Sequence, residues 1–177
     1  MTAPSANEPG TPVVHPDLAA LAPLIGTWSG TGHGSYPTIE PFDYREELLF
    51  APVGDRPFLR YSQRTWDARD GRPLHVETGY LRAGRPGAAE LVVAQPTGVV
   101  EVDEGAVASE GPGHLEVVLR SRSVAVSSTA KEVTEVERVF SLGKGVLRTR
   151  VAISAVGQPL TPHLASELRP PPASNHD

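Results

Sequence analysis

The side chains of this chain that could do chemistry are mainly its histidines. The sequence holds six histidines and four tyrosines, no cysteine, and a single methionine at position 1. Disulfides, zinc–thiolate sites, iron–sulfur clusters and a cysteine nucleophile are therefore excluded. The lack of cysteine also fits a reducing compartment. Histidine and tyrosine remain as the side chains best able to ligate a metal such as iron.

The positions of the histidines favour two of them. Four lie in terminal segments, on the polar face of a strand or at a turn: His15, His176, His33 and His114. The other two, His75 and His163, lie within stretches that alternate as strands do. They are the candidates for an interior site, and the residues alone leave the choice between them open. The tyrosines lie on or just before expected strands, where packing is their usual role.

The neighbours of these two histidines differ. His163 lies in QPLTPHLASELR, where Pro162 restricts the backbone before it and leucines supply apolar surroundings. His75 lies in PLHVETGYLR and shares a strand face with Glu77, which predicts a solvated or hydrogen-bonded pair. A catalytic dyad would need a nucleophile beside it, and no G-x-S-x-G motif is present.

A glycine-rich stretch, GTWSGTGHG, occupies residues 26–34. It lacks the GxxxxGK[ST] and GxGxxG spacings and no helical pattern follows it, so it does not resemble a phosphate-binding loop. Alternation places Gly26, Trp28, Gly30 and Gly32 on one strand face. Two explanations stay open: the glycines permit strand curvature, or they make room for a flat ligand.

Period-two alternation, interrupted by turn residues, recurs along the rest of the chain. The expected strands lie at residues 26–34, 42–51, 57–66, 73–83, 88–95, 98–108, 113–126, 132–141, 145–154 and 159–166. The connections contain Gly, Pro or Asp and are short, which favours pairing between sequential strands. We therefore predict an all-β fold, a ten-stranded antiparallel up-and-down β-barrel with an interior cavity, in preference to a sandwich.

The two ends of the chain differ in composition from its middle. Residues 1–16 and 170–177 are rich in Pro, Ala, Ser or Thr, and we expect a disordered leader and a disordered tail. The stretch 17–26 predicts a short N-terminal helix with Asp17 as its N-cap. Residues 17–169 would then form one barrel domain.

The charge distribution argues against some classes of partner. The net charge is −5 and no Lys/Arg cluster occurs, so neither nucleic acid nor an anionic membrane surface is an expected partner. No apolar run approaches the length of a transmembrane helix and the N-terminus lacks the features of a secretory signal, so a cytoplasmic location is expected. The carboxylates of VVEVDEG (99–105) alternate with valines, which predicts an outward strand face rather than a metal site.

Several separated motifs resemble the nitrobindin family. They are GTWSGTG, GSYPTIEPFDYREEL, HVETGYLR (75–82), TAKEVTEVERVF (129–140) and LTPHLASELR (160–169), in the order expected for that family. The resemblance covers about residues 18–169. It implies a ten-stranded barrel that holds one ferric haem b per chain, binds nitric oxide and isomerises peroxynitrite to nitrate.

The resemblance also implies roles for individual residues. His163, in LTPHL, would be the axial iron ligand and the catalytic residue. Thr38, in YPTIEPF, and Lys131, in TAKEVTEVER, would contact the haem, and the Lys131 ammonium could donate to a propionate. The other expected cofactor-binding residues, which match the family's glycine motif, are Gly26, Trp28, Gly30 and Gly32.

Two other functions stay open. A barrel of this kind could carry a fatty acid or another small apolar molecule without catalysis, with a buried arginine holding the carboxylate. The arginines available on expected strands are Arg60, Arg64, Arg138, Arg148 and Arg150. A haem carrier or nitric oxide sensor without turnover is the second alternative, and a homodimer formed through an outer barrel face is compatible with either.

Overall fold

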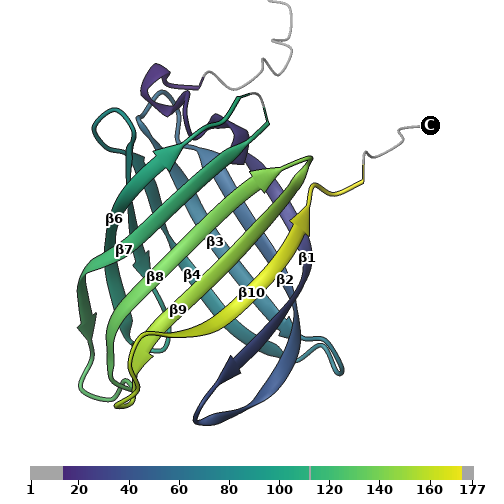
Figure 1. The fold of residues 1–177 in the computed structure, drawn as a ribbon, viewed down its shortest axis with the longest axis vertical. Coiled ribbons are helices and arrows are strands. Elements are labelled where there is room, and N and C mark those ends of the chain that lie inside the picture. Colours follow the sequence, from purple (N-terminus) through teal and green to yellow (C-terminus); the bar gives the residue numbers. More distant parts are fainter. Residues whose placement is uncertain (1–13, 112, 173–177) are drawn as a thin grey trace, which may run out of the picture.

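The chain folds into a closed β-barrel (Figure 1). The structure, a computed structural model, describes residues 14–111 and 113–172. Within these residues the strands are β1 (Gly26–Tyr36), β2 (Ile39–Pro52), β3 (Phe58–Asp67), β4 (Pro73–Ala83), β5 (Ala88–Ala94), β6 (Val99–Ala108), β7 (Leu115–Val126), β8 (Val133–Gly143), β9 (Val146–Ala155) and β10 (Thr161–Arg169). Each strand pairs antiparallel with its sequence neighbours, and β1 closes the barrel against β10. The predicted ten-stranded up-and-down barrel is confirmed.

The strand boundaries follow the turn residues of the sequence. Every observed strand begins and ends within three residues of its predicted position. The hairpin between β8 and β9 turns at Lys144 and Gly145, whose φ angles are 53° and 71°. Positive φ at both central residues is what the tight turn between twisted antiparallel strands requires.

The N-terminal segment forms two separate 3₁₀ turns, η1 (Pro16–Leu18) and η2 (Ala22–Leu24), in place of a single short helix. Pro23 lies within the stretch expected to be helical, where it lacks an N–H and disfavours the helical conformation of the preceding residue. The cap also differs from the predicted one, because the Nδ1 of His15 accepts a hydrogen bond from the backbone N–H of Asp17 at 3.2 Å. Most of the predicted disordered leader and tail lies outside the described residues.

These two turns close the end of the barrel at which β1 begins (Figure 1). Leu18, Leu21 and Leu24 are fully buried there, and the indole N–H of Trp28 donates to the carbonyl of Leu24 at 2.7 Å. The apolar core beneath them is contributed by most strands and consists of Leu48, Phe50, Leu59, Tyr61, Leu81, Ala89, Leu91, Val93, Leu115, Val117, Leu119, Phe140, Leu142, Leu147 and Leu168. This half of the interior is filled with side chains.

The glycine face of β1 points into the barrel. His33 points outward, where its Nδ1 lies within hydrogen-bond distance of Oδ1 of Asp43, at 2.8 Å. A Cβ on Gly32 would overlap the ring of Tyr44, and a Cβ on Gly34 would overlap the ring of Phe42. The paired strand β2 therefore lays its aromatic rings across these glycines. The glycines make room for side chains of the barrel itself.

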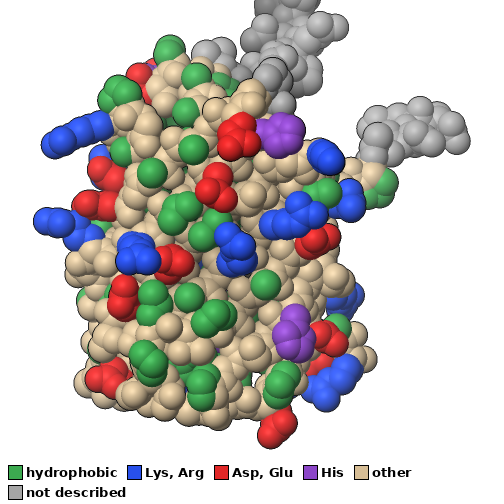
Figure 2. All heavy atoms as spheres, viewed as in Figure 1, with side chains coloured by type: hydrophobic (Ala, Val, Ile, Leu, Met, Phe, Trp, Pro, Cys, Tyr) green, Lys and Arg blue, Asp and Glu red, His purple; other side chains and the backbone are tan. Residues whose placement is uncertain are grey.

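The outer surface mixes charges of both signs. On the face in Figure 2, acidic and basic side chains are interspersed with single hydrophobic ones. Among the described residues, no helix is both long and apolar enough to cross a membrane.

Candidate functional site

A cavity of about 700 Å³ occupies the half of the interior away from the N-terminal turns. Its walls come mainly from the ends of odd-numbered strands and the starts of even-numbered strands, including β10. The up-and-down topology brings these strand ends and starts to one end of the barrel. A second hollow of about 480 Å³ shares Ile39, Lys131 and His163 with it. Both volumes fall in the usual range for small-molecule and cofactor sites, about 300–1,000 Å³.

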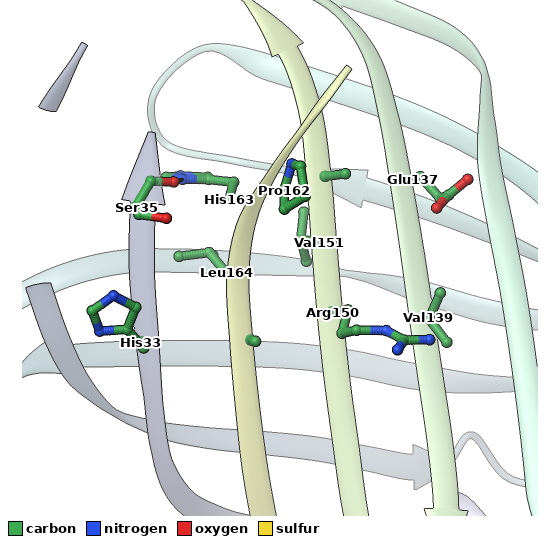
Figure 3. A pocket seen from close by; sticks show the side chains of 11 residues that line it. His33, Ser35, Glu137, Val139, Arg150, Val151, Pro162, His163 and Leu164 are labelled. Carbon is green, nitrogen blue, oxygen red and sulfur yellow. Dashed lines mark hydrogen bonds between the residues drawn. The ribbon is translucent and has the colours of Figure 1, made fainter. Parts of the chain in front are cut away.

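His163 reaches this cavity because β10 is irregular at that position. The register against β9 shifts between Pro162 and Leu164, so His163 has no partner on β9. The ladder with β1 ends at the pair Gly34 and Leu164, just before His163. Such a bulge changes the side-chain alternation, so that His163 and Leu164, adjacent in sequence, both line the cavity. Figure 3 is a close view of a neighbouring pocket that His163 also lines, and it shows His163 next to Ser35 of β1 and beside Pro162.

One ring nitrogen of His163 is held by the backbone. Its Nδ1 lies 3.0 Å from the carbonyl oxygen of Ser35. Because a carbonyl can only accept, Nδ1 carries the proton and donates it, and Nε2 is left with a free lone pair. The edge of the Tyr36 ring packs against the imidazole, with 5.4 Å between centroids. Tyr36 is itself fixed, since its hydroxyl accepts from the backbone N–H of Ala155 at 3.0 Å.

The surroundings of His163 favour the neutral imidazole. Burial lowers the pKa of His163 below its usual value, which outweighs the opposite effect of the hydrogen bond to Ser35. A neutral imidazole with one nitrogen fixed by a carbonyl is the form in which histidine binds metals. The geometry therefore leaves His163 able to bind a metal through Nε2 without prior deprotonation of the ring.

A single histidine donor in an apolar setting suits a metal that is already coordinated by a cofactor. Within the described part of the chain, no group of three or more His, Asp or Glu side chains could hold a metal ion. The apolar residues that line the cavity are Ile39, Phe42, Leu74, Val133, Val136, Val151, Ile153 and Leu164. A planar iron porphyrin, which needs one axial donor and apolar faces, fits this arrangement better than a bare ion does.

The other predicted site residues fall into two groups. Thr38 lines the second hollow and Lys131 lines both, so the structure brings these residues and His163 around one site. Gly26, Trp28, Gly30 and Gly32 are not among the residues that line either hollow. Trp28 packs in the closed, apolar half, so its contribution is to the core.

A second histidine, His75, lines the same cavity. Its Nε2 lies 3.1 Å from Oε1 of Glu77, so the predicted hydrogen-bonded pair is confirmed. Glu77 is buried and accepts from both terminal nitrogens of Arg138, at 2.9 and 3.0 Å, and from the Tyr61 hydroxyl at 3.0 Å. Burial alone would raise the pKa of Glu77, but the Arg138 guanidinium and His75 outweigh it and lower the pKa to about 2.

Arg138 anchors a charged floor beneath the cavity. Its guanidinium also lies 2.9 Å from Glu101 and 3.4 Å from Asp103, and all three side chains are buried. Burial raises the pKa of Asp103 to about 7, against the lowering effect of Arg138. A guanidinium already paired with three carboxylates is a poor partner for a fatty-acid carboxylate, which counts against Arg138 in the lipid-carrier alternative.

This floor contradicts one prediction. The carboxylates of residues 99–105 were expected on an outward strand face, but Glu101 and Asp103 point inward with 1% and 0% exposure. Val100 and Val102 point outward instead, with 44% and 36% exposure. The partner that permits this inversion lies two strands away on β8, where Arg138 supplies the counter-charge.

The sequence contained one signal for this floor. In VERVFSL, Arg138 alternates with Val136, Phe140 and Leu142, so a charge occupies an apolar strand face. Such a charge must be paired when the face is buried. No comparable signal marks Gln95, whose amide donates to Glu101 at the cavity wall.

Comparisons with known proteins identify the family of this barrel. The family model described as "THAP4-like, heme-binding beta-barrel domain" matches residues 17–169. The chain is 53% identical over 155 residues to "Peroxynitrite isomerase 2" of Mycobacterium avium, covering 88% of this chain and 95% of that protein. It is 51% identical over 156 residues to "Peroxynitrite isomerase" of Nocardia farcinica, covering 88% and 92% of the two chains. The crystal structure of Rv2717c from M. tuberculosis superimposes with a TM-score of 0.86 at 46% identity, covering 90% of this chain and 99% of that one.

Proposed function

Since the chain belongs to the THAP4-like haem-binding β-barrel family, the nitrobindin family, we propose that it holds one haem b through His163 and isomerises peroxynitrite to nitrate. The observation that carries the proposal is the orientation of His163. Its Nδ1 is engaged by Ser35, its Nε2 has no hydrogen-bond partner among the described residues, and the side chain lines a cavity large enough for a cofactor. The domain responsible would be residues 17–169.

The remaining residues of the cavity would position the cofactor. Lys131 lies at the junction of the two hollows, where its ammonium can pair with a propionate. Thr38 lines the second hollow and would pack at the porphyrin edge. The apolar walls would exclude water from the porphyrin faces. Bound haem would supply the iron at which peroxynitrite rearranges, and also a site for nitric oxide.

Hemin titration tests the proposal directly. Purified wild-type protein should show a saturable one-to-one shift of the Soret band, and His163→Ala should lose or broaden it. His33→Ala is the matched control, because His33 is a hydrogen-bonded histidine of the neighbouring strand β1 that lies on the outer face. An identical shift in wild type and His163→Ala would overturn the assignment of the ligand.

Stopped-flow kinetics then distinguish a peroxynitrite isomerase from a haem carrier or nitric oxide sensor without turnover. The haem-loaded protein should accelerate peroxynitrite decay in proportion to its concentration, with nitrate as the product. Nitric oxide binding without any acceleration of peroxynitrite decay would identify a sensor or haem carrier instead.

A further inference from the structure

The cavity contains a second imidazole whose chemistry haem ligation does not use. His75 lines the same cavity as His163, and the two are close enough for His75 to contribute to the lowered pKa of His163. The side chain of His75 is 25% exposed, so water can reach it. Its Nε2 is engaged by Glu77, and its Nδ1 has no hydrogen-bond partner within residues 14–111 and 113–172.

The backbone holds His75 at an irregular point of its own strand. The register between β3 and β4 shifts after the pair Thr65 and His75. The Thr65 hydroxyl takes the place of a ladder partner and accepts from the backbone N–H of His75 at 3.0 Å. Both cavity histidines thus lie next to a β-bulge, a feature that re-aims side chains beside functional sites.

We propose that His75 is a catalytic proton acceptor for the protonated form of the substrate and that Glu77 is its positioning residue. The proposal rests on the proposed function. Peroxynitrous acid, ONOOH, would give its proton to Nδ1 of His75, breaking the O–H bond and forming an N–H bond. The peroxynitrite anion and an imidazolium result, and the anion is the form that a cationic iron centre attracts. Nitrate does not take the proton back, so the imidazolium returns it to water at the cavity mouth.

Glu77 provides what such a base requires. With Arg138 and Tyr61 as its other partners, Glu77 stays ionised, so Nε2 of His75 carries the proton and Nδ1 the lone pair. A carboxylate on the far side of an imidazole fixes its orientation and stabilises the imidazolium that forms. Because Glu77 bonds both His75 and Arg138, the charged floor would help to position the proton acceptor.

Other charges near the cavity leave this dyad intact. The cavity is lined by further titratable groups besides His75 and Glu77. They are Glu40, Tyr44, Asp67, Arg69, Arg72, Glu101, Lys131, Arg138 and His163. Asp67 is satisfied by Arg69 and Arg72, at 2.9 and 3.8 Å. Lys131 has the propionate role proposed above. His75 is therefore the group of this wall with both a free basic nitrogen and a supporting carboxylate.

The test uses haem-loaded protein and a second weak acid. Hydrogen cyanide, like peroxynitrous acid, must lose a proton to bind ferric haem as an anion, whereas nitric oxide needs no proton transfer. We expect His75→Phe to slow cyanide association by about 100-fold, the usual contribution of general base catalysis. Nitric oxide association and hemin affinity should stay at wild-type values. Peroxynitrite decay should slow most at acidic pH, where the substrate is protonated.

Two further variants complete the experiment. Glu77→Gln keeps the imidazole but removes the supporting charge, and should give a smaller loss in cyanide association. His33→Phe changes the outer histidine and should match wild type. Equal rates for cyanide in wild type and His75→Phe would overturn the proposal, as would equal slowing of cyanide and nitric oxide, which indicates a steric role. Failure of wild type to bind hemin would instead defeat the proposed function, and the Soret titration reveals that first.

Discussion

The two halves of the barrel interior are built by the same strands but filled in opposite ways. The half under the N-terminal turns is apolar and closed, with Leu18, Leu21 and Leu24 fully buried. The other half holds a cavity of about 700 Å³ above a floor of buried charge centred on Arg138. Close packing stabilises the fold in the first half, and the second half can be hollow because of it.

This division separates the residues for stability from the residues for ligand binding along the barrel axis. The floor around Arg138 marks the boundary, because it contacts the cavity through Glu77 and lies next to core residues such as Phe140. Changes in the closed half should therefore alter the free energy of unfolding without altering cofactor affinity. Changes at the boundary should alter both.

The largest effect is expected at the boundary. Arg138→Met removes the counter-charge from buried Glu77, Glu101 and Asp103, which should lower the free energy of unfolding by about 3–5 kcal/mol. Urea unfolding followed by tryptophan fluorescence measures it. Arg148→Met is the control, because its exposed pair with Glu167 should contribute less than about 1 kcal/mol. Equal losses in the two variants would show that the floor is not a special element of the fold.

A second prediction concerns the closed half alone. Leu24→Ala leaves a cavity under η2 and should cost about 2–5 kcal/mol of stability. The hemin dissociation constant should not change, since the residues lining the cavity come from the other half. Parallel urea and Soret titrations test the separation. A large loss of hemin affinity in a folded Leu24→Ala protein would contradict it.

The third prediction is a pH dependence of the free energy of unfolding that arises at the floor. The pKa of Asp103 is raised to about 7 in the fold, so the folded state holds a proton that the unfolded chain has released. Stability from this group is therefore lost as pH rises from about 4 through 7, with a slope of at most about 1.4 kcal/mol per pH unit. Glu77, with its pKa lowered to about 2, has the opposite sign, and its contribution is constant above about pH 5.

Asp103→Asn isolates this contribution. The difference in unfolding free energy between Asp103→Asn and wild type should grow in favour of the variant as pH rises from 5 to 8. Burial also raises the pKa of Glu46, and the pKa of His163 is lowered. Taking the difference in unfolding free energy between the two proteins cancels the contributions of both groups. A difference that stays constant over this range would mean that Asp103 is ionised throughout.

The barrel itself was predictable because each strand carries its own alternation and each turn its own Gly, Pro or Asp. The hairpin at Lys144 and Gly145 is an example of such local information. The N-terminal helix was not predictable in detail, because Pro23 allows short 3₁₀ turns that pack leucines equally well. Local chemistry thus determined where strands lie, and tertiary packing determined what the first residues do.

The site was predictable only in part. In residues 99–105 both strand faces carry valines, so alternation alone could not decide which face is inside. The decision depends on Arg138, two strands away on β8. His75 and His163 could not be separated by residue type. The resemblance to the family singled out His163, and the structure adds the bulge and the hydrogen bond to Ser35 that orient it. Bulges leave no clear mark in a single sequence, since they are a property of paired strands.

The bulge at His163 decides which residues of β10 face the cavity, because it changes the alternation of side chains along the strand. In a regular strand, odd and even positions face opposite sides, and one extra residue exchanges the two classes. Deleting a residue at Pro162 would restore regular counting against β9 without altering the histidine. A barrel of this design can thus gain or lose the proposed iron ligand by a change in strand length, so an engineer can switch the site by insertion or deletion as well as by substitution.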